Sequence, residues 1–191
     1  MDREETEIRP EKGFGRRPFF RELLSWILTI AIAFLVAKII NEHVLYKAIV
    51  PTGSMENNIM TGDQIMGLQI AYLFSEPKRG DIVIFPLPDN PSVTYVKRII
   101  GLPGETLEVR DGLVYIDGTP LQENYLKEEM IGDYGPYEVP EGCYFMMGDN
   151  RNISADARKW QNKFVKKEDI IARAIFRYQP SFQWYKKVNY E

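Results

Sequence analysis

The longest apolar stretch of the chain runs from Leu23 to Ala37 without a charged residue. As a helix it spans about 22 Å, and extension to Phe19 and Ile40 gives enough length for the roughly 30 Å hydrocarbon core of a bilayer. A helix in the core of a soluble protein normally keeps one polar face toward water, and this run has none. We therefore predict a transmembrane anchor over residues 19–41 in preference to a buried core helix.

A cleaved signal peptide is the alternative interpretation of the same run. Ala31-Ile32-Ala33 has the small-x-small form of a cleavage site. The apolar residues continue through Phe34-Leu35-Val36, so cleavage there would fall inside the membrane core and not at its polar edge. We expect an anchor that is not cleaved.

Basic residues are more frequent before the predicted span than after it. By the positive-inside rule, residues 1–18 form a cytoplasmic tail and residues 42–191 form an extracytoplasmic domain. The basic residues near the amino-terminal end of the apolar run include Arg9, Lys12, Arg16, Arg17 and Arg21, whereas those near its other end are Lys38 and Lys47.

After residue 48 the pattern changes to short apolar and β-branched runs separated by turn residues, which is typical of strands. Asp111-Gly112, between two such runs, is a strong signal for a two-residue hairpin. We predict a mainly β domain built on a closed, barrel-like or a coiled antiparallel sheet. The predicted strands are Asp81–Phe85, Ser92–Ile100, Thr106–Arg110, Leu113–Ile116, Cys143–Met147 and Ala172–Tyr178.

Helical periodicity beyond the anchor is limited to two short segments, Leu68–Phe74 and Lys166–Ile171. The first segment is apolar, and the sequence leaves two structures open for it. It can form a core strand or helix, or it can form an apolar surface that enters the bilayer beside the anchor.

Composition argues against nucleic-acid binding and against the usual zinc sites. The net charge is -3 and the basic residues are scattered, so no positive field faces a nucleic acid. One cysteine, Cys143, and one histidine, His43, are too few for ordinary zinc ligation, although carboxylate sites for magnesium or calcium are not excluded by this count. We expect no metal and no cofactor, a buried thiol at Cys143, and an interfacial position for His43.

Ser54, in Pro51–Met55, is a candidate nucleophile, although Gly-Ser is also ordinary turn chemistry. A Ser-His-Asp triad would have to use the lone His43, so a lysine is the expected base. Lys97 is the candidate because it lies in a predicted strand of otherwise apolar and β-branched residues, on the same face as Tyr95. Burial would depress its pKa and give a neutral amine, whereas the alternative is a solvated strand lysine.

A third stretch, Gly148–Arg158, is dense in turn-forming residues and in paired opposite charges. Alone it fits a polar surface loop tied by ion pairs. Together with Pro51–Met55 and Tyr95–Gly104, in that order after one anchor, it closely resembles the type I signal peptidases, which are Ser-Lys enzymes of the peptidase S26 type. The short separation between Gly104 and Gly148 is similar to the compact form that is common in Gram-positive bacteria.

The resemblance implies a catalytic dyad and an oxyanion hole. Ser54 would be the nucleophile, and Lys97, without its extra proton, would be the general base. The oxyanion donors would be the Ser54 backbone N–H and the Thr52 hydroxyl.

The resemblance also implies a supporting set in the third stretch. Ser154 would hold the Lys97 amine. Asp156 and Arg158 would form an ion pair that braces the loop beside the dyad, and Asp149 would support the same loop.

The activity implied is removal of N-terminal signal peptides from secreted preproteins with small residues at positions -1 and -3, at a bacterial cell membrane. Those preproteins and the lipid bilayer are the expected partners. An extended substrate segment is expected to lie against the strand that leads into Ser54. Two alternatives stay open: a signal peptidase dedicated to a narrow client set, and a non-catalytic membrane-anchored β domain that binds preproteins.

The chain departs from the family's usual residues at three places, none of which carries the bond-breaking chemistry. We expect the departures to affect the turn after Ser54 and the loop after Trp160. They are Asn57 and Asn58 in place of proline and threonine, Ala157 in place of serine, and Gln161-Asn162-Lys163 where a glycine is usual.

Overall fold

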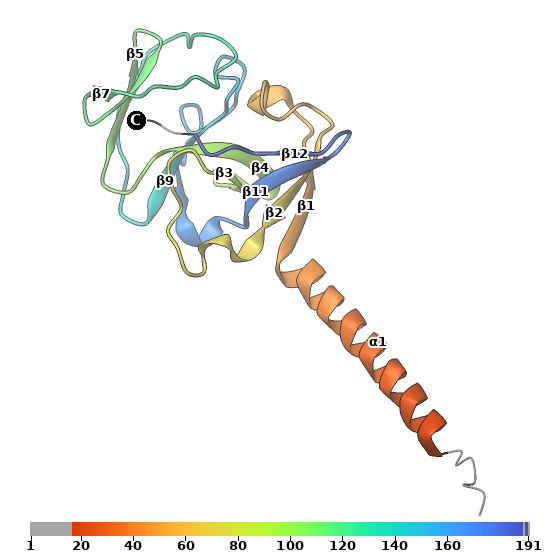
Figure 1. Ribbon diagram of the computed structural model, residues 1–191. Helices are drawn as coiled ribbons and strands as arrows, with labels where there is room; N and C mark the ends of the chain where they lie inside the picture. The colour runs from red at the N-terminus through yellow and green to blue at the C-terminus, as the bar shows by residue number, and fades with distance from the viewer. Residues whose placement is uncertain (1–16, 189, 191) are drawn as a thin grey trace, which may run out of the picture. The chain divides into compact units, whose positions relative to one another are not determined.

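The computed structural model describes residues 17–188 and residue 190, and the chain divides into two compact units between Ile39 and Ile40 (Figure 1). The first unit is helical and the second is rich in strands. Residues 1–16 of the predicted cytoplasmic tail, with Arg9, Lys12 and Arg16, lie outside the described residues.

Helix α1 spans Arg17–His43 and corresponds to the predicted apolar helix. Its part from Phe19 to His43 has 25 residues, about 37 Å of helix, and is the one described helix long and apolar enough to cross a membrane. All side chains of that part are exposed. The Thr29 hydroxyl donates a 2.8 Å hydrogen bond to the Ser25 carbonyl oxygen, so this polar group needs no water.

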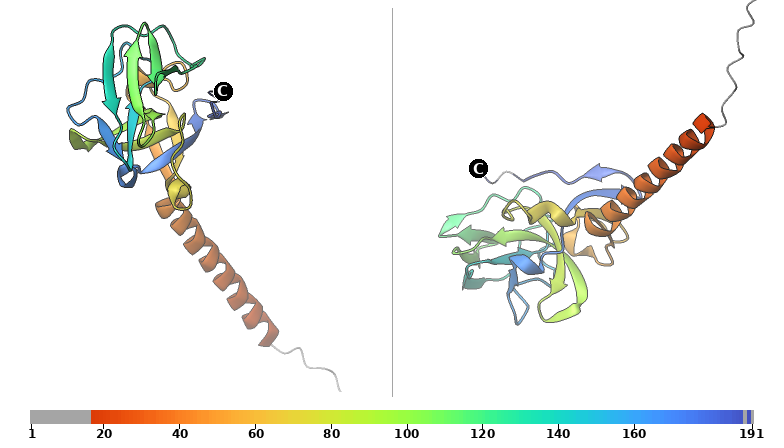
Figure 2. Two further views of the ribbon diagram at one scale, coloured as in Figure 1. Left: turned by 90° about the vertical axis from the view of Figure 1, so that its left-hand side faces the viewer. Right: turned by 90° about the horizontal axis from the view of Figure 1, so that it is seen from below.

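Two antiparallel sheets form the second unit (Figure 2). In the larger sheet the strand order is β1-β2-β11-β3-β4-β9-β10, with β12 paired to β11, and in the smaller sheet it is β7-β6-β5-β8. The larger sheet contains β1 (Leu45–Ile49), β2 (Gln64–Leu68), β3 (Ile82–Leu87), β4 (Asn90–Gly101), β9 (Cys143–Met147), β10 (Phe164–Lys166), β11 (Ala172–Gln179) and β12 (Gln183–Trp184). The smaller sheet contains β5 (Thr106–Arg110), β6 (Leu113–Ile116), β7 (Thr119–Pro120) and β8 (Tyr134–Glu138), and three short 3-10 helices are η1 (Gly53–Met55), η2 (Gln69–Tyr72) and η3 (Lys167–Asp169).

The six predicted strands are present, and β5, β6 and β9 have the predicted bounds. Asp111 and Gly112 both have positive φ, 50° and 75°, as the two-residue turn between β5 and β6 requires. Strand β8 was not predicted, because Gly135 and Pro136 in its middle are ordinary signals for a turn.

The larger sheet is open, because its end strands β1 and β10 do not pair with each other. The mainly antiparallel β fold is confirmed, but the closed alternative is wrong. Burial is achieved instead by packing the two sheets against each other. The main core cluster accordingly combines Val83, Ile99 and Phe145 of the larger sheet with Leu107 and Val114 of the smaller one.

A second core cluster fixes the turn that follows β1. Val50 and Met55 are buried on either side of the Pro51–Ser54 turn, and Ile59 is buried just after it. These side chains pack against the larger sheet, so both ends of the turn are held by apolar contacts.

The segment Leu68–Phe74 is divided between the two predicted alternatives: Leu68 ends β2 and Tyr72 packs against the main core cluster, whereas Ile70, Leu73 and Phe74 are exposed. It forms the short helix η2, after which Leu73 and Phe74 are 67% and 97% exposed. β2 ends at Leu68, and the Gln69 side chain donates to the carbonyl oxygens of Glu42 and Leu45 at 3.2 and 3.0 Å. The apolar residues after Gln69 therefore leave the sheet at the end of β2, and Gln69 joins this point to the residues that end α1.

The lone cysteine packs at the margin of the main core cluster, and the lone histidine is exposed. Cys143 is half-buried and not fully buried as predicted, because it begins β9 beside the short edge strand β10. Burial nevertheless raises the pKa of its thiol. His43 is exposed and is the last residue of α1.

Candidate active site

Ser54 lies in η1, and its backbone is held by the third sequence stretch. The Asn150 backbone N–H donates to the Ser54 carbonyl oxygen at 3.1 Å, and the Asn150 side-chain amide donates to the Gly53 carbonyl oxygen at 3.0 Å. Ser54 itself is only 9% exposed. Together with the buried Val50 and Met55, these bonds fix the direction in which the hydroxyl points.

Lys97 reaches this hydroxyl from β4. Its Nζ lies 2.5 Å from the Ser54 Oγ, and the residue is 3% exposed, so the solvated alternative is wrong. The Tyr95 ring centroid lies 5.0 Å from the same Nζ, in agreement with the prediction that Tyr95 and Lys97 share one face of the strand. The two proposed catalytic atoms are therefore in direct hydrogen-bond contact.

The environment of Lys97 favours a neutral amine. Burial lowers its pKa to about 8, and the positive charge of Arg158 acts in the same direction. The negative charges of Asp156 and Asp149 oppose this effect but do not cancel it. The pKa therefore lies within reach of mildly alkaline pH, which suits a general base.

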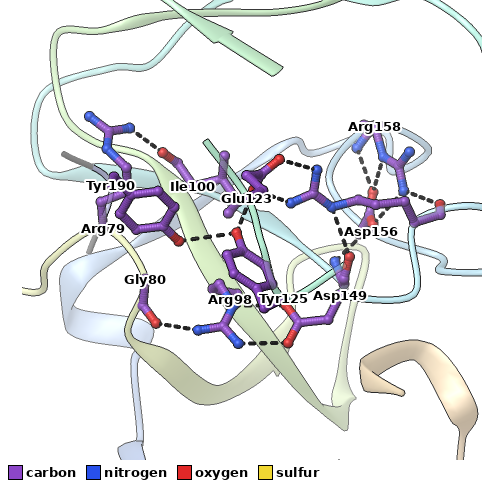
Figure 3. A network of polar contacts seen from close by, with 12 residues as sticks. Arg79, Gly80, Arg98, Ile100, Glu123, Tyr125, Asp149, Asp156, Arg158 and Tyr190 are labelled. Carbon is purple, nitrogen blue, oxygen red and sulfur yellow. Dashed lines mark hydrogen bonds and ion pairs between the residues drawn. The ribbon is translucent and has the colours of Figure 1, made fainter. Parts of the chain in front are cut away.

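The carboxylates near Lys97 are already paired with arginines. Arg98 makes a bidentate ion pair with Asp149, with Nε–Oδ1 and Nη2–Oδ2 distances of 2.8 and 2.6 Å, and donates to the Gly80 carbonyl oxygen at 2.7 Å (Figure 3). Arg151 makes a bidentate ion pair with Glu123. Buried charges in proteins are normally paired in this way, and the pairing leaves Lys97 without a dedicated carboxylate.

Asp156 and Arg158 form the third buried pair (Figure 3). The Arg158 Nε and Nη2 donate to the two Asp156 oxygens, each at 2.8 Å, and the Gly148 N–H donates to the same carboxylate at 3.0 Å. Although burial alone raises the pKa of Asp156, these bonds and the Arg158 charge hold it below its usual range. The loop after β9 is thus closed by a charged pair that stays ionised.

Ser154 is fully buried beside Ser54 and Lys97, and its hydroxyl makes no hydrogen bond to Lys97 among the described residues. It does lie close enough to Asp156 to help lower the pKa of that carboxyl. Gly148 explains how closely this region packs. A Cβ added to Gly148 would come 2.3 Å from the Ser154 Oγ and 2.5 Å from the Ser54 carbonyl oxygen. Glycine is therefore required at this position by the contact between the first and third stretches.

Thr52 is exposed and lies next to the nucleophile. Its Oγ1 is 3.4 Å from the Ser54 Oγ, which places a hydroxyl donor at the open side of the dyad. This distance is at the long limit of a hydrogen bond, so the Thr52 hydroxyl is available to a substrate group.

The dyad opens into a groove of about 560 Å³. Its walls come from β1 with the following turn, from the first half of β4, and from two residues of the third stretch. The lining residues are Tyr46–Ser54, Val93–Lys97, Ile153 and Ala155. The groove thus runs alongside β1, which is an end strand of the larger sheet.

Most positions where the sequence departs from the family pattern have defined contacts, whereas Asn57 is exposed. The Asn58 side chain donates to Asp149 at 2.8 Å. Ala157 is fully buried in the main core cluster. The backbone N–H groups of Gln161 and Asn162 donate to the Asp89 carboxylate at 2.9 and 2.8 Å, which shapes the loop after Trp160.

Two residues beside the site were missed from the sequence. Glu123 and Tyr125 lie between β7 and β8, outside every motif, and contact Arg151 and Arg98. A count of charges in the motifs could have indicated that a further carboxylate was needed. The motifs supply three arginines but only the two carboxylates of Asp149 and Asp156, so a third buried carboxylate was needed.

The family model for signal peptidase, peptidase S26, matches residues 23–179. The chain belongs to this family. Signal peptidase I of Leptolyngbya laminosa is 37% identical over 165 residues, which cover 83% of this chain and 80% of that protein. Signal peptidase I of Bacillus licheniformis is 38% identical over 155 residues, which cover 76% and 83%. A crystal structure of a signal peptidase I from Enterococcus faecalis is 38% identical with a TM-score of 0.46, and covers 52% of this chain and 97% of that one.

The S26 assignment confirms the resemblance seen in the sequence, including the similarity to Bacillus members. The chain is therefore a hydrolase of the signal peptidase family. The matched residues contain Ser54, Lys97 and the whole third stretch, so the buried contact described above lies within the part of the chain that defines the family.

Proposed function

We propose that this protein is a membrane-anchored serine endopeptidase that removes N-terminal signal peptides from secreted preproteins, with Ser54 as nucleophile and neutral Lys97 as general base. One observation carries the proposal: the Lys97 Nζ lies 2.5 Å from the Ser54 Oγ in a buried setting. An amine whose pKa is about 8 is largely unprotonated at mildly alkaline pH and can accept the hydroxyl proton.

In the proposed reaction, the Lys97 lone pair takes the Ser54 proton while Oγ attacks the scissile carbonyl carbon. The resulting ammonium gives that proton to the leaving amine, so the peptide bond breaks and the mature protein departs. The signal peptide remains as an ester on Ser54. Water then attacks the ester with Lys97 again as base, which releases the signal peptide and restores the hydroxyl.

The proposed oxyanion donors are the Ser54 N–H and the Thr52 hydroxyl. The position of the Thr52 Oγ1, 3.4 Å from the nucleophilic oxygen, supports this assignment. Loss of one such donor typically costs about 3 kcal/mol of transition-state stabilisation.

Ser154 is the proposed partner of the Lys97 amine. Its hydroxyl is fully buried and lies close to Gly148, which also packs against the Ser54 carbonyl oxygen, so the hydroxyl is within the region of the proposed dyad. Asp149 and the Asp156–Arg158 pair are proposed to keep the loop around Ser154 in place.

The proposed substrate binds as an extended segment along β1. Because β1 is an end strand, its outer backbone groups can pair with a peptide. The aromatic and β-branched walls of the groove, at Tyr46, Val93 and Tyr95, are proposed to admit only small side chains at positions -1 and -3.

Anchoring at a bacterial cell membrane is proposed from α1. Residues 1–18 would be cytoplasmic, residues 19–41 would span the bilayer once, and residues 42–191 would form the extracytoplasmic catalytic domain. The exposed apolar surface of α1 and the excess of basic residues before it support this topology. The exposed Leu73 and Phe74 are proposed to contact lipid, because Gln69 ties their segment to the residues that end α1.

The test is cleavage of a preprotein with Ala-x-Ala at its junction by the full chain in liposomes. We expect Ser54→Ala to abolish cleavage and Ser92→Ala, at an exposed serine outside the groove, to retain it. Cleavage by Ser54→Ala would refute the nucleophile. Binding without cleavage by the wild type would favour the non-catalytic alternative, and cleavage of one preprotein from a panel would favour the narrow client set.

A further inference from the structure

The segment of residues 121–133, between β7 and β8, contains none of the three motifs, yet it contacts residues beside each of them. The Tyr125 carbonyl oxygen accepts a 3.3 Å hydrogen bond from Asn58, and the Arg98 guanidinium lies 4.2 Å from the Tyr125 ring centroid. Glu123 accepts a 2.7 Å hydrogen bond from the Arg151 Nη1.

These three partners are close in sequence to the proposed catalytic groups. Asn58 follows Ser54 by four residues, Arg98 directly follows Lys97, and Arg151 precedes Ser154 by three residues. Segment 121–133 therefore touches the chain beside the nucleophile, beside the base and beside the residue proposed to hold the base.

Asp149 joins two of these partners directly. Its Oδ2 accepts from the Asn58 Nδ2 at 2.8 Å, while its two oxygens accept from the Arg98 Nε and Nη2 at 2.8 and 2.6 Å. Asp149 is completely buried, so these charge-assisted bonds are not weakened by water. One carboxylate thus links the turn after Ser54 to the strand that carries Lys97.

Tyr125, from segment 121–133, lies against Arg98 of the Arg98–Asp149 ion pair (Figure 3). Its hydroxyl donates to Glu123 and lies 3.0 Å from the Tyr190 hydroxyl. Burial and the nearby Glu123 charge raise the pKa of this hydroxyl, so it stays protonated and remains a donor. The ring is consequently held in the orientation that contacts Arg98.

We propose that segment 121–133 sets the distance between the Ser54 hydroxyl and the Lys97 amine, with Tyr125 and Asn58 as positioning residues. The inference rests on the dyad of the proposed function. Neither Tyr125 nor Asn58 lines the groove, so substrate binding does not depend on them directly. Their removal instead frees the turn after Ser54 to move relative to β4, and a displacement of about 1 Å can cost about a hundredfold in rate.

The experiment compares Tyr125→Leu, Tyr125→Phe and Asn58→Leu in the full chain with preprotein substrate, and measures kcat, KM and the unfolding temperature of each. Tyr125→Leu and Asn58→Leu are expected to lower kcat about tenfold or more with KM unchanged, below the temperature at which they unfold. Tyr125→Phe keeps the ring over Arg98, which Tyr125→Leu removes, so it is expected to recover most of kcat.

The matched control is Tyr115→Leu. Tyr115 also lies under an arginine, with the Arg110 guanidinium 3.9 Å from its ring centroid, but this pair is on the smaller sheet away from the dyad. The same substitution therefore removes the same kind of contact, and kcat is expected to stay within about twofold of the wild type.

Several results would overturn the proposal. If Tyr125→Leu unfolds at a lower temperature but keeps its kcat per folded molecule, segment 121–133 is only structural. A change in KM alone would assign it to substrate binding.

If Tyr125→Leu fails to fold, Asn58→Leu, at a half-buried position, replaces it as the test. An unchanged kcat in Asn58→Leu would then refute the positioning role. Ser54→Ala is assayed in parallel: an active Ser54→Ala refutes the dyad, whereas an inactive one with unaffected Tyr125→Leu refutes only the positioning role.

Discussion

Lys97 and Arg98 are consecutive in β4 and both buried, but only Arg98 has a carboxylate of its own. Arg98 is bound on two sides by Asp149, whereas Lys97 makes its 2.5 Å contact with the uncharged Ser54 hydroxyl. Because strand side chains alternate, one step along β4 separates a permanently charged residue from one that can lose its proton. The rate of cleavage and the stability of the fold are therefore both expected to depend on the protonation of Lys97.

The cleavage rate is expected to rise with pH through the pKa of Lys97. The amine must be neutral to act as a base, and its pKa is about 8, so kcat/KM should increase between pH 6 and pH 9 with a midpoint near 8. Steady-state cleavage of a preprotein across this range measures the profile. Lys97→Arg should be inactive at every pH, because a guanidinium does not lose its proton. A flat profile, or an active Lys97→Arg, would contradict a lysine base.

Lys97→Met is expected to be more stable than the wild type at neutral pH. The folded pKa of about 8 lies below the ordinary value of 10.5, so the unfolded state binds more protons and wild-type stability rises with pH through this window. Below pH 8 the buried Lys97 ammonium lowers the free energy of unfolding by its full amount, about 3 kcal/mol. Chemical unfolding at pH 7 and pH 10 should therefore show a large advantage for Lys97→Met at pH 7 and a small one at pH 10. Equal advantages at both values would indicate packing and not ionisation.

Asp149→Asn is expected to move the midpoint of the rate profile below pH 8. The Asp149 charge raises the Lys97 pKa, and its loss also leaves the Arg98 charge uncompensated, so both effects disfavour the ammonium form. Breaking a buried ion pair in this way should also cost about 3–5 kcal/mol of stability. Asp89→Asn is the control, since this exposed carboxylate accepts from the Gln161 and Asn162 backbone N–H groups and its charge is not one of those that shift the Lys97 pKa. A midpoint that stays at 8 or rises would contradict the expectation.

Thr52→Val is expected to lower kcat about a hundredfold and to leave KM nearly unchanged, because an oxyanion donor acts mainly in the transition state. Thr52→Ser keeps the hydroxyl and should recover much of the loss. Thr106→Val, on the smaller sheet, controls for the loss of a threonine hydroxyl elsewhere. An equal loss in Thr52→Val and Thr52→Ser would assign the effect to the methyl group and not to the hydroxyl.

Local signals predicted the apolar helix and six of the twelve described strands. The apolar run that became α1 and the short apolar and β-branched runs that became β5, β6 and β9 carry their information within a few residues. Strand β8 was missed from the sequence because its pairing with β5 outweighs the turn preference of Gly135-Pro136. The exposure of Phe74 also could not be read from its apolar neighbours, because it depends on where β2 ends.

The contact between Ser54 and Lys97 could be predicted because both residues stand in recognisable stretches. That the chain contains a single histidine narrowed the choice of candidate base to a lysine. The residues that pair with the buried arginines could not be predicted from the sequence. Whether Arg151 pairs within its own loop or with Glu123 depends on how the smaller sheet packs against the larger one, and the sequence contains no local sign of that contact. Asn58 was noted only as a departure, and its bond to Asp149 is a tertiary contact over 91 positions.

The hydrogen bonds from Asn150 to the Gly53 and Ser54 carbonyl oxygens have a consequence for when the proposed site can form during synthesis. Gly53 and Asn150 are 97 positions apart, and synthesis proceeds from the amino terminus. A growing chain therefore presents its serine and its lysine long before the residue that orients the serine exists. A ribosome-bound chain arrested before Gly148 would contain both members of the proposed dyad yet lack a formed site, so proteolytic competence is expected only once the residues from Gly148 onward have emerged.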